Sequence, residues 1–185
     1  MFQSIISRRN QILITLGLLV LAAVAIALAP KAVRADEGTP IEGTFTVSFS
    51  ALPNTAGDSF CGGTPSGNVV EAHGAGSSTL GALSLSLEKT VVGPALHGCL
   101  TLTAPNGDSL SAIYDGTFTD APNANNFRNA VGTLTFTGGT GRFQGASGSA
   151  NFTAVFSRIG GTANPTQGIA FYSIEGTLSF PNGDQ

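Results

Sequence analysis

The sequence is poor in the residues that most often carry out catalysis or bind metal ions. Its 185 residues include two histidines, two cysteines and no tryptophan, and only 10% of them are charged. Two cysteines and two distant histidines do not supply the usual ligand set of a zinc site. No G-x-S-x-G or H-E-x-x-H motif is present, so two common hydrolase signatures are also missing. We therefore predict a protein with no metal and no cofactor.

Basic residues are scarce beyond residue 35. The only ones are Lys89, Arg128, Arg142 and Arg158, against eleven acidic residues, which gives this part of the chain a formal charge of −7. Binding to nucleic acid depends on clustered cations that neutralise phosphates, and no such cluster is present. The same charge disfavours electrostatic binding to an acidic membrane. We expect neither kind of partner.

The first 35 residues differ in kind from the rest. Arg8 and Arg9 precede an apolar run over residues 12–30, and small residues around Ala35 provide a cleavage site. This order is typical of a signal peptide, so we predict that residues 1–35 form a signal helix and that the protein is secreted, periplasmic or at the cell surface. An uncleaved anchor is the alternative, because the run is almost long enough to span a bilayer. We expect no contact with a membrane other than this anchor. The arginine pair is compatible with both the general and the twin-arginine export routes.

Residues 36–185 alternate between apolar and polar side chains with a period of two, which is typical of strands. In Thr44–Ser50 the phenylalanines and the valine share one face and hydroxyl residues share the other. Eight segments show such a pattern: residues 44–50, 68–73, 83–87, 100–103, 109–119, 131–137, 149–157 and 168–180. We predict a single all-β domain, an antiparallel barrel of about eight strands, with a two-sheet sandwich as the alternative.

Turn residues separate these segments. Asn106-Gly107 lies between two of them and predicts a tight hairpin. Gly138-Gly139 and Gly160-Gly161 indicate two further turns. The segment Asp120–Asn129 is rich in Asn, Ala and Pro, and we expect no regular structure in it.

The two cysteines, Cys61 and Cys99, both lie beyond the signal segment. In an oxidising compartment two such thiols favour a disulfide, which would close a loop of about 38 residues. The loop-entropy relation gives a stabilisation of about 3–4 kcal/mol.

The glycine-rich segment Gly138–Gly148 is the most distinctive in the chain. It is not a phosphate-binding loop, because no Gly-Lys-Ser/Thr ends it and Gln144 interrupts the G-x-G-x-x-G spacing. Its glycines instead suit a barrel corner with close backbone approach. We expect Phe143 to fill the interior there and Arg142 to pair with a carboxylate.

The run Gly-Gly-Thr-Gly-Arg-Phe-x-Gly-Ala-x-Gly in this segment resembles the signature of the allene oxide cyclase and dirigent barrel superfamily, including its bacterial secreted members. The following strand, Ser149–Ser157, and the closing strand through Ile174–Leu178 are similar too, so the resemblance covers about 45 residues. It implies an eight-stranded antiparallel barrel, often oligomeric, with a cavity for apolar small molecules. The resemblance further implies a homo-oligomer and a cyclase or isomerase activity.

Few residues are candidates for a site. Glu71 and His73 share a face of one predicted strand and would form an acid/base pair only if that face lined the barrel. If Glu175 pointed inward it would need a cationic partner, and Arg142 or Arg158 could supply one. We favour the solvent-exposed alternative for the Glu71–His73 pair, and expect Glu175, if inward, to be structural. The candidates for ligand contact are aromatic residues: Phe45, Phe49, Tyr114, Phe143 and Tyr172.

Three functions are compatible with these patterns. The first is binding of an apolar or amphipathic small molecule inside an exported barrel. The second is a structural or cell-surface barrel whose interior is filled by its own side chains. The third is an isomerase of the allene oxide cyclase kind. The volume and lining of the barrel interior decide among them.

Overall fold

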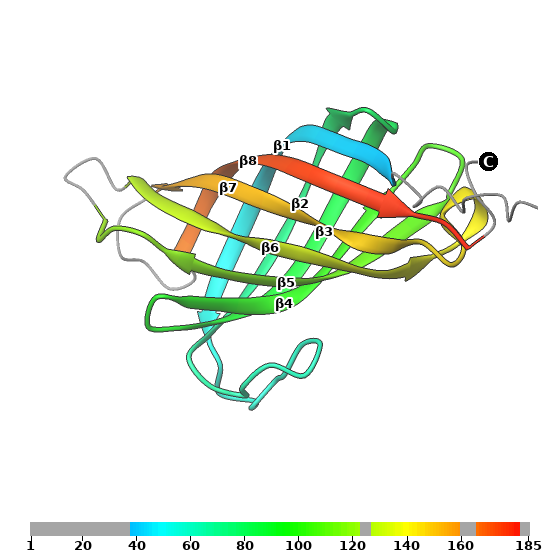
Figure 1. The fold of residues 1–185 in the computed structure, drawn as a ribbon. Coiled ribbons are helices and arrows are strands. Elements are labelled where there is room, and N and C mark those ends of the chain that lie inside the picture. Colours follow the sequence, from blue (N-terminus) through cyan, green and yellow to red (C-terminus); the bar gives the residue numbers. More distant parts are fainter. Residues whose placement is uncertain (1–37, 123–126, 160–165, 182–185) are drawn as a thin grey trace, which may run out of the picture. The chain divides into compact units, whose positions relative to one another are not determined.

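The computed structural model describes residues 38–122, 127–159 and 166–181, and in this part of the chain eight strands form one closed antiparallel barrel (Figure 1). The predicted all-β barrel is therefore confirmed. The signal segment 1–35 lies outside the described residues. The strands are β1 (Thr39–Pro53), β2 (Asn68–Ser78), β3 (Gly81–Val92), β4 (Ala95–Thr103), β5 (Ser109–Phe118), β6 (Phe127–Gly139), β7 (Ser147–Ile159) and β8 (Thr166–Ser179).

Each strand pairs with its neighbours in the sequence, and β1 pairs with β8 to close the barrel. At that seam Thr39 lies opposite Leu178, and Phe45 lies opposite Tyr172. Closure leaves no unpaired strand edge, which protects a weakly charged sheet from edge-to-edge association.

Several strands extend beyond the segments in which the alternation is obvious. β3 continues five residues past Leu87 to Val92, and β6 begins at Phe127. The prediction that residues 120–129 lack regular structure is therefore wrong for the last three, which pair with β7. The Asn106-Gly107 turn is confirmed between β4 and β5, with Gly107 at φ 92°. The turn expected at residues 160 and 161 lies outside the described residues.

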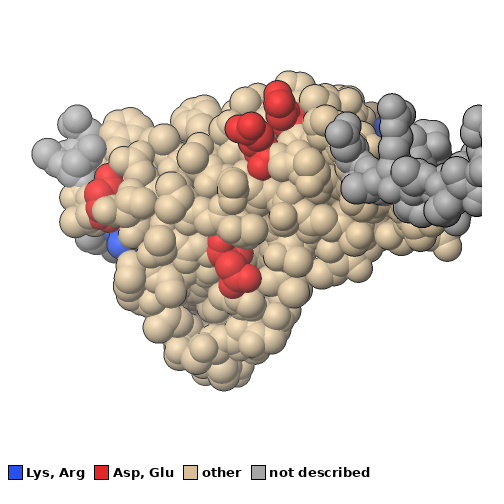
Figure 2. Space-filling view, viewed as in Figure 1, with Lys and Arg blue, Asp and Glu red and all other residues tan. Residues whose placement is uncertain are grey.

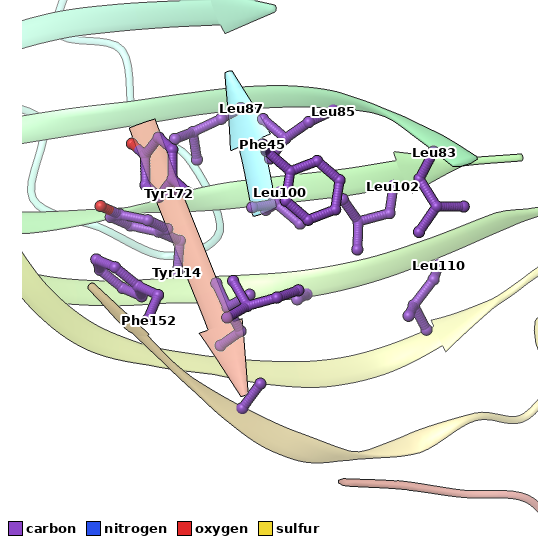
Figure 3. Close-up of a cluster of buried hydrophobic side chains, with 14 of the residues drawn as sticks. Phe45, Leu83, Leu85, Leu87, Leu100, Leu102, Leu110, Tyr114, Phe152 and Tyr172 are labelled. Atoms are coloured by element: carbon purple, nitrogen blue, oxygen red, sulfur yellow. The ribbon is translucent and has the colours of Figure 1, made fainter. Parts of the chain in front are cut away.

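The interior is filled at one end by aliphatic and aromatic side chains. Leu83, Leu102 and Leu110 are buried there. Further along the axis, Tyr114, Phe152 and Tyr172 form an aromatic layer, with the Tyr114 and Phe152 rings stacked at 4.4 Å between centroids. Figure 3 shows the two tyrosine hydroxyls on the side of this layer that faces away from Leu83 and Leu110.

The Phe152 ring fits because its neighbours on β5 and β6 are glycines. A Cβ on Gly116 would lie 2.6 Å from the Phe152 ring, and one on Gly132 would lie 2.5 Å from it. These glycines therefore make room for a large ring inside a narrow barrel.

The glycine-rich corner between β6 and β7 has the predicted structural role. It contains a short 3-10 helix, η1 (Gly141–Phe143), and Phe143 is 1% exposed beneath it. Gly141 and Gly145 adopt positive φ, which glycine does without strain. The expected carboxylate partner of Arg142 is absent from the described residues. The guanidinium donates instead to the Leu80 carbonyl at 2.9 Å and lies over the Phe143 ring.

The predicted disulfide between Cys61 and Cys99 is present and ties the segment between β1 and β2 to β4. His97 strengthens this attachment, because its Nε2 contacts the Cys61 carbonyl at 3.0 Å and its Nδ1 contacts Asp115. Only the imidazolium can donate to both acceptors. The hydrogen bond to Asp115 and then that to Cys61 raise the pKa of His97 above its ordinary value.

On the face of the barrel seen in Figure 2, a few separate acidic spots lie on a mostly uncharged surface. The strand registers place glutamates opposite one another: Glu42 faces Glu175, and Glu71 faces Glu88. Among the described residues, no helix is long and apolar enough to cross a membrane.

Candidate functional site: a cationic cavity at one end of the barrel

A cavity of about 540 Å³ lies at the end of the barrel opposite the glycine-rich corner. It lies where β1, β3, β5 and β7 end and where β2, β6 and β8 begin, and its side chains come from inward positions of these strands. They are Phe49, Ala51, Pro53, Asn68, Val70, Lys89, Val91, Phe118, Arg128, Phe156, Arg158 and Thr166, with Gly93 at the margin. The barrel is thus filled at one end and hollow at the other.

Aromatic rings form much of the cavity wall. Phe156 makes edge-to-face contacts with Phe49 and Phe118, with centroid distances of 5.8 and 5.4 Å. Such pairs hold each ring in a defined orientation. The wall is therefore an apolar surface that exists before any ligand arrives.

Lys89 lies at the inner end of this cavity and is only 1% exposed. It points inward because it continues the alternation of Leu85 and Leu87 along β3. Its cross-strand neighbour is Gly98, on which a Cβ would lie 2.5 Å from both Cα and Cβ of Lys89. The missing side chain on β4 thus leaves the space that the lysine occupies.

The Lys89 ammonium is held by tyrosines and aromatic rings. Its Nζ donates to the Tyr114 hydroxyl at 3.4 Å and to the Tyr172 hydroxyl at 3.3 Å. It also lies 4.6 Å from the Tyr114 ring centroid and 4.7 Å from that of Phe156. Within the described residues Lys89 forms no ion pair, so its charge has only neutral partners.

Burial without a counter-ion changes the protonation of this group. It lowers the pKa of Lys89 from 10.5 to about 7, because the ammonium is removed from water. Burial also raises the pKa values of Tyr114 and Tyr172 well above their ordinary range, so both hydroxyls are neutral. At neutral pH about half of the Lys89 side chains are therefore free amines.

Two arginines lie nearer the open end. Arg128 donates from Nε to the Asp120 carbonyl at 2.9 Å, and its guanidinium lies 3.6 Å from the Phe118 ring centroid. Burial and then the nearby charge of Arg158 lower the pKa of Arg128, while Asp120 opposes this shift. Neither arginine forms an ion pair with another described residue. Among the described residues, the cavity lining contains Lys89, the two arginines and no carboxylate.

The sequence-predicted site residues are distributed over both faces of the barrel. Glu71, His73 and Glu175 are exposed on the outer face, outside the cavity. For Glu71 and His73 this is the solvent-exposed arrangement that the sequence favoured. Glu175 therefore needs no buried cationic partner.

Among the aromatic candidates, Phe49 lines the cavity. Tyr114 and Tyr172 lie beneath it and contact Lys89. Phe45 and Phe143 belong to the filled part of the core. No group of three or more His, Cys, Asp or Glu side chains in the described part of the chain is arranged to hold a metal ion.

The sequence did not reveal that these cationic residues line a cavity: Lys89 and Arg128 entered only the count of charges, and Arg158 also served as a possible partner of Glu175. The inward position of Lys89 could have been predicted from its strand. Leu83, Leu85 and Leu87 alternate toward the interior, and extending that alternation by two residues places Lys89 on the same side. Arg128 lies at the start of a strand that was predicted to begin later, and Arg158 lies two residues after Phe156 on the same inward phase.

Comparison with known proteins gives a likeness in fold. No family model and no curated protein sequence matches the chain. The chain is similar to the solved structure of a pterocarpan synthase dirigent protein, with 17% identity and a TM-score of 0.47 over 82% of this chain and 92% of that one. At this level of similarity we infer no activity, substrate or family membership from it.

Proposed function

We propose that this is an exported barrel protein that binds an amphipathic small molecule, an apolar body bearing an acidic group, in the cavity at its open end. The observation that carries the proposal is the lining of that cavity among the described residues: aromatic and aliphatic walls, two arginines and no carboxylate. A disulfide in a protein with this N-terminal segment is compatible with an extracytoplasmic location.

The size of the cavity suits such a ligand. Pockets for small molecules commonly have volumes of about 300–1,000 Å³, and this one has about 540 Å³. A barrel filled by its own side chains would account for the end around Leu83 and Phe143, but not for the end around Phe49 and Phe156.

The positions of the charges suggest how the ligand is oriented. Arg158 is exposed and Arg128 is half-buried, so both can receive an anionic group that remains partly hydrated. Guanidinium groups bind carboxylates through paired, charge-assisted hydrogen bonds. The apolar body of the ligand would then extend inward over Phe118 and Phe156 toward Lys89.

A displacement experiment tests this function. The full chain is loaded with the neutral fluorescent probe N-phenylnaphthylamine and titrated with dodecanoic acid or with dodecanol. We expect both to displace the probe, the acid at about tenfold lower concentration, which corresponds to about 1.4 kcal/mol from the arginine contacts. Arg158→Gln should remove most of that preference.

Arg142→Gln is the matched control, because Arg142 lies at the closed corner of the barrel, where it caps the Leu80 carbonyl. The variant should retain the preference for the acid. Failure of both ligands to displace the probe would refute binding in the cavity. Equal affinity for the acid and the alcohol would refute the role given to the arginines.

A further inference from the structure

Lys89 is a primary amine at the inner end of an apolar cavity, and the binding of an acidic ligand at the arginines leaves it without a role. We propose that Lys89 is a covalent binding site, which forms an imine with an aldehyde group carried at the buried end of an apolar ligand. The inference rests on the proposed function in one respect, that both use the same cavity.

The position of Lys89 gives its amine both access and selectivity. The side chain borders the cavity, but it is 1% exposed to bulk solvent. A molecule that reaches Nζ through this cavity passes the rings of Phe49, Phe118 and Phe156, which line it. Apolar aldehydes are favoured by such a route over small polar ones, because they bury apolar surface on the way in.

The protonation of the amine suits nucleophilic attack. Only the free amine attacks a carbonyl carbon, and an ordinary lysine is in that form in roughly one molecule out of 2,500 at pH 7. Burial lowers the pKa of Lys89 to about 7, so about half of the molecules carry the nucleophile. A lysine desolvated in a hydrophobic pocket is one of the recognised ways to activate this side chain.

The two tyrosines orient the amine. Nζ donates to the hydroxyls of Tyr114 and Tyr172, both of which lie beneath the cavity. A neutral amine has two N–H groups and one lone pair, so two donated hydrogen bonds leave the lone pair in the remaining tetrahedral direction. No carboxylate among the described residues pairs with Nζ, so the protonated form of the amine has no counter-ion in this part of the chain.

The reaction balances without a further reagent. The amine nitrogen attacks the aldehyde carbon and forms a carbinolamine. Loss of the carbonyl oxygen, together with the two hydrogens that the amine carried, then releases one water. A carbon–nitrogen double bond replaces the carbon–oxygen double bond, and nothing is oxidised or reduced. The neutral tyrosine hydroxyls beside Nζ can relay a proton to the departing oxygen.

Borohydride trapping tests the inference with few competing sites, because the chain has only one other lysine, Lys31. The folded full chain is incubated with decanal and sodium cyanoborohydride at pH 7, and the reduced adduct is mapped by peptide mass spectrometry. We expect Lys89 to be modified at least tenfold faster than Lys31. In urea the two rates should become similar, because unfolding removes both the cavity and the lowered pKa.

Variants assign the reaction to the residue. Lys31→Arg should leave the modification of the folded protein unchanged, and Lys89→Met should abolish the fast adduct while circular dichroism shows an intact barrel. Modification of Lys89 no faster than Lys31 in the folded state would overturn the inference, and so would a fast adduct that maps only to the terminal amine. The rate in the unmutated chain decides the matter even if a variant fails to fold.

Excess dodecanoic acid separates this inference from the proposed function. Slower modification of Lys89 in its presence supports both, because the two ligands then share the cavity. Fast modification that the acid does not affect supports the imine and counts against acid binding. Acid binding with no adduct at Lys89 overturns the imine alone.

Discussion

Replacing Lys89 by methionine should change how the stability of the barrel depends on pH. Burial lowers the pKa of Lys89 from 10.5 to about 7. Between these two values the unfolded chain binds more protons than the folded one, so the free energy of unfolding rises with pH. Below about pH 7 both states are protonated and the full cost of burying the ammonium is present.

The size of the effect follows from the shift. Each pKa unit corresponds to about 1.4 kcal/mol, so the cost of the buried ammonium is about 5 kcal/mol in acid and about 2 kcal/mol at pH 9. Between pH 7 and pH 9 the unmutated protein should therefore gain about 2 kcal/mol of unfolding free energy. Lys89→Met has no group that titrates at this position and should lack that gain.

Urea unfolding of both proteins at half-unit steps from pH 6 to pH 9, followed by far-ultraviolet circular dichroism, measures the difference directly. Contributions of other groups, including His97, cancel when one curve is subtracted from the other. The range stops at pH 9 because Tyr114 and Tyr172 have raised pKa values and their burial favours unfolding at higher pH. A flat difference curve would show that Lys89 is not buried as an amine without a counter-ion.

Three further predictions concern the barrel wall. Replacing both Cys61 and Cys99 by alanine should lower the free energy of unfolding by about 4 kcal/mol in urea titrations; an unchanged midpoint would contradict this. Glu175→Gln should raise the unfolding free energy by a few tenths of a kcal/mol, less in high salt, because Glu42 lies directly opposite. His97 has a raised pKa, so its contribution is complete below about pH 6.5 and declines as pH rises through the folded value. His97→Gln should therefore cost up to about 1 kcal/mol at pH 6 and less at pH 8.5.

The barrel could be predicted from the sequence because strand patterns are local. Alternation, as in Phe45 and Val47, records which side chains face the interior, and turn residues such as Asn106-Gly107 mark where the chain reverses. The disulfide was predictable by arithmetic, since only Cys61 and Cys99 are available. The number of strands and the cost of leaving edges open favoured a closed barrel, but a two-sheet sandwich was also compatible with the sequence.

The cavity could not be predicted in the same way. Its existence depends on how side chains from seven strands fill the space at one end, and alternation does not report volume. Charged residues are normally assigned to the surface. Lys89 was therefore not expected in the interior, although it falls on the inward-facing side of its strand. Arg128 and Arg158 were hidden because they lie near strand ends, where sequence patterns are least informative.

The cavity depends on the seam between β1 and β8, where the two ends of the domain pair and close the barrel. Seven of the eight strand pairings join neighbours along the chain and can form as local hairpins, but the pairing of Thr39 with Leu178 brings together the two ends of the barrel. Contacts so distant in sequence form late in folding, because a long loop must be closed first. Tyr172 on β8 is one of the two hydroxyls that contact Lys89. A chain that lacks its last strand also lacks one of the two hydroxyls that contact the Lys89 amine, so the surroundings of this amine are complete only after the seam between β1 and β8 has formed.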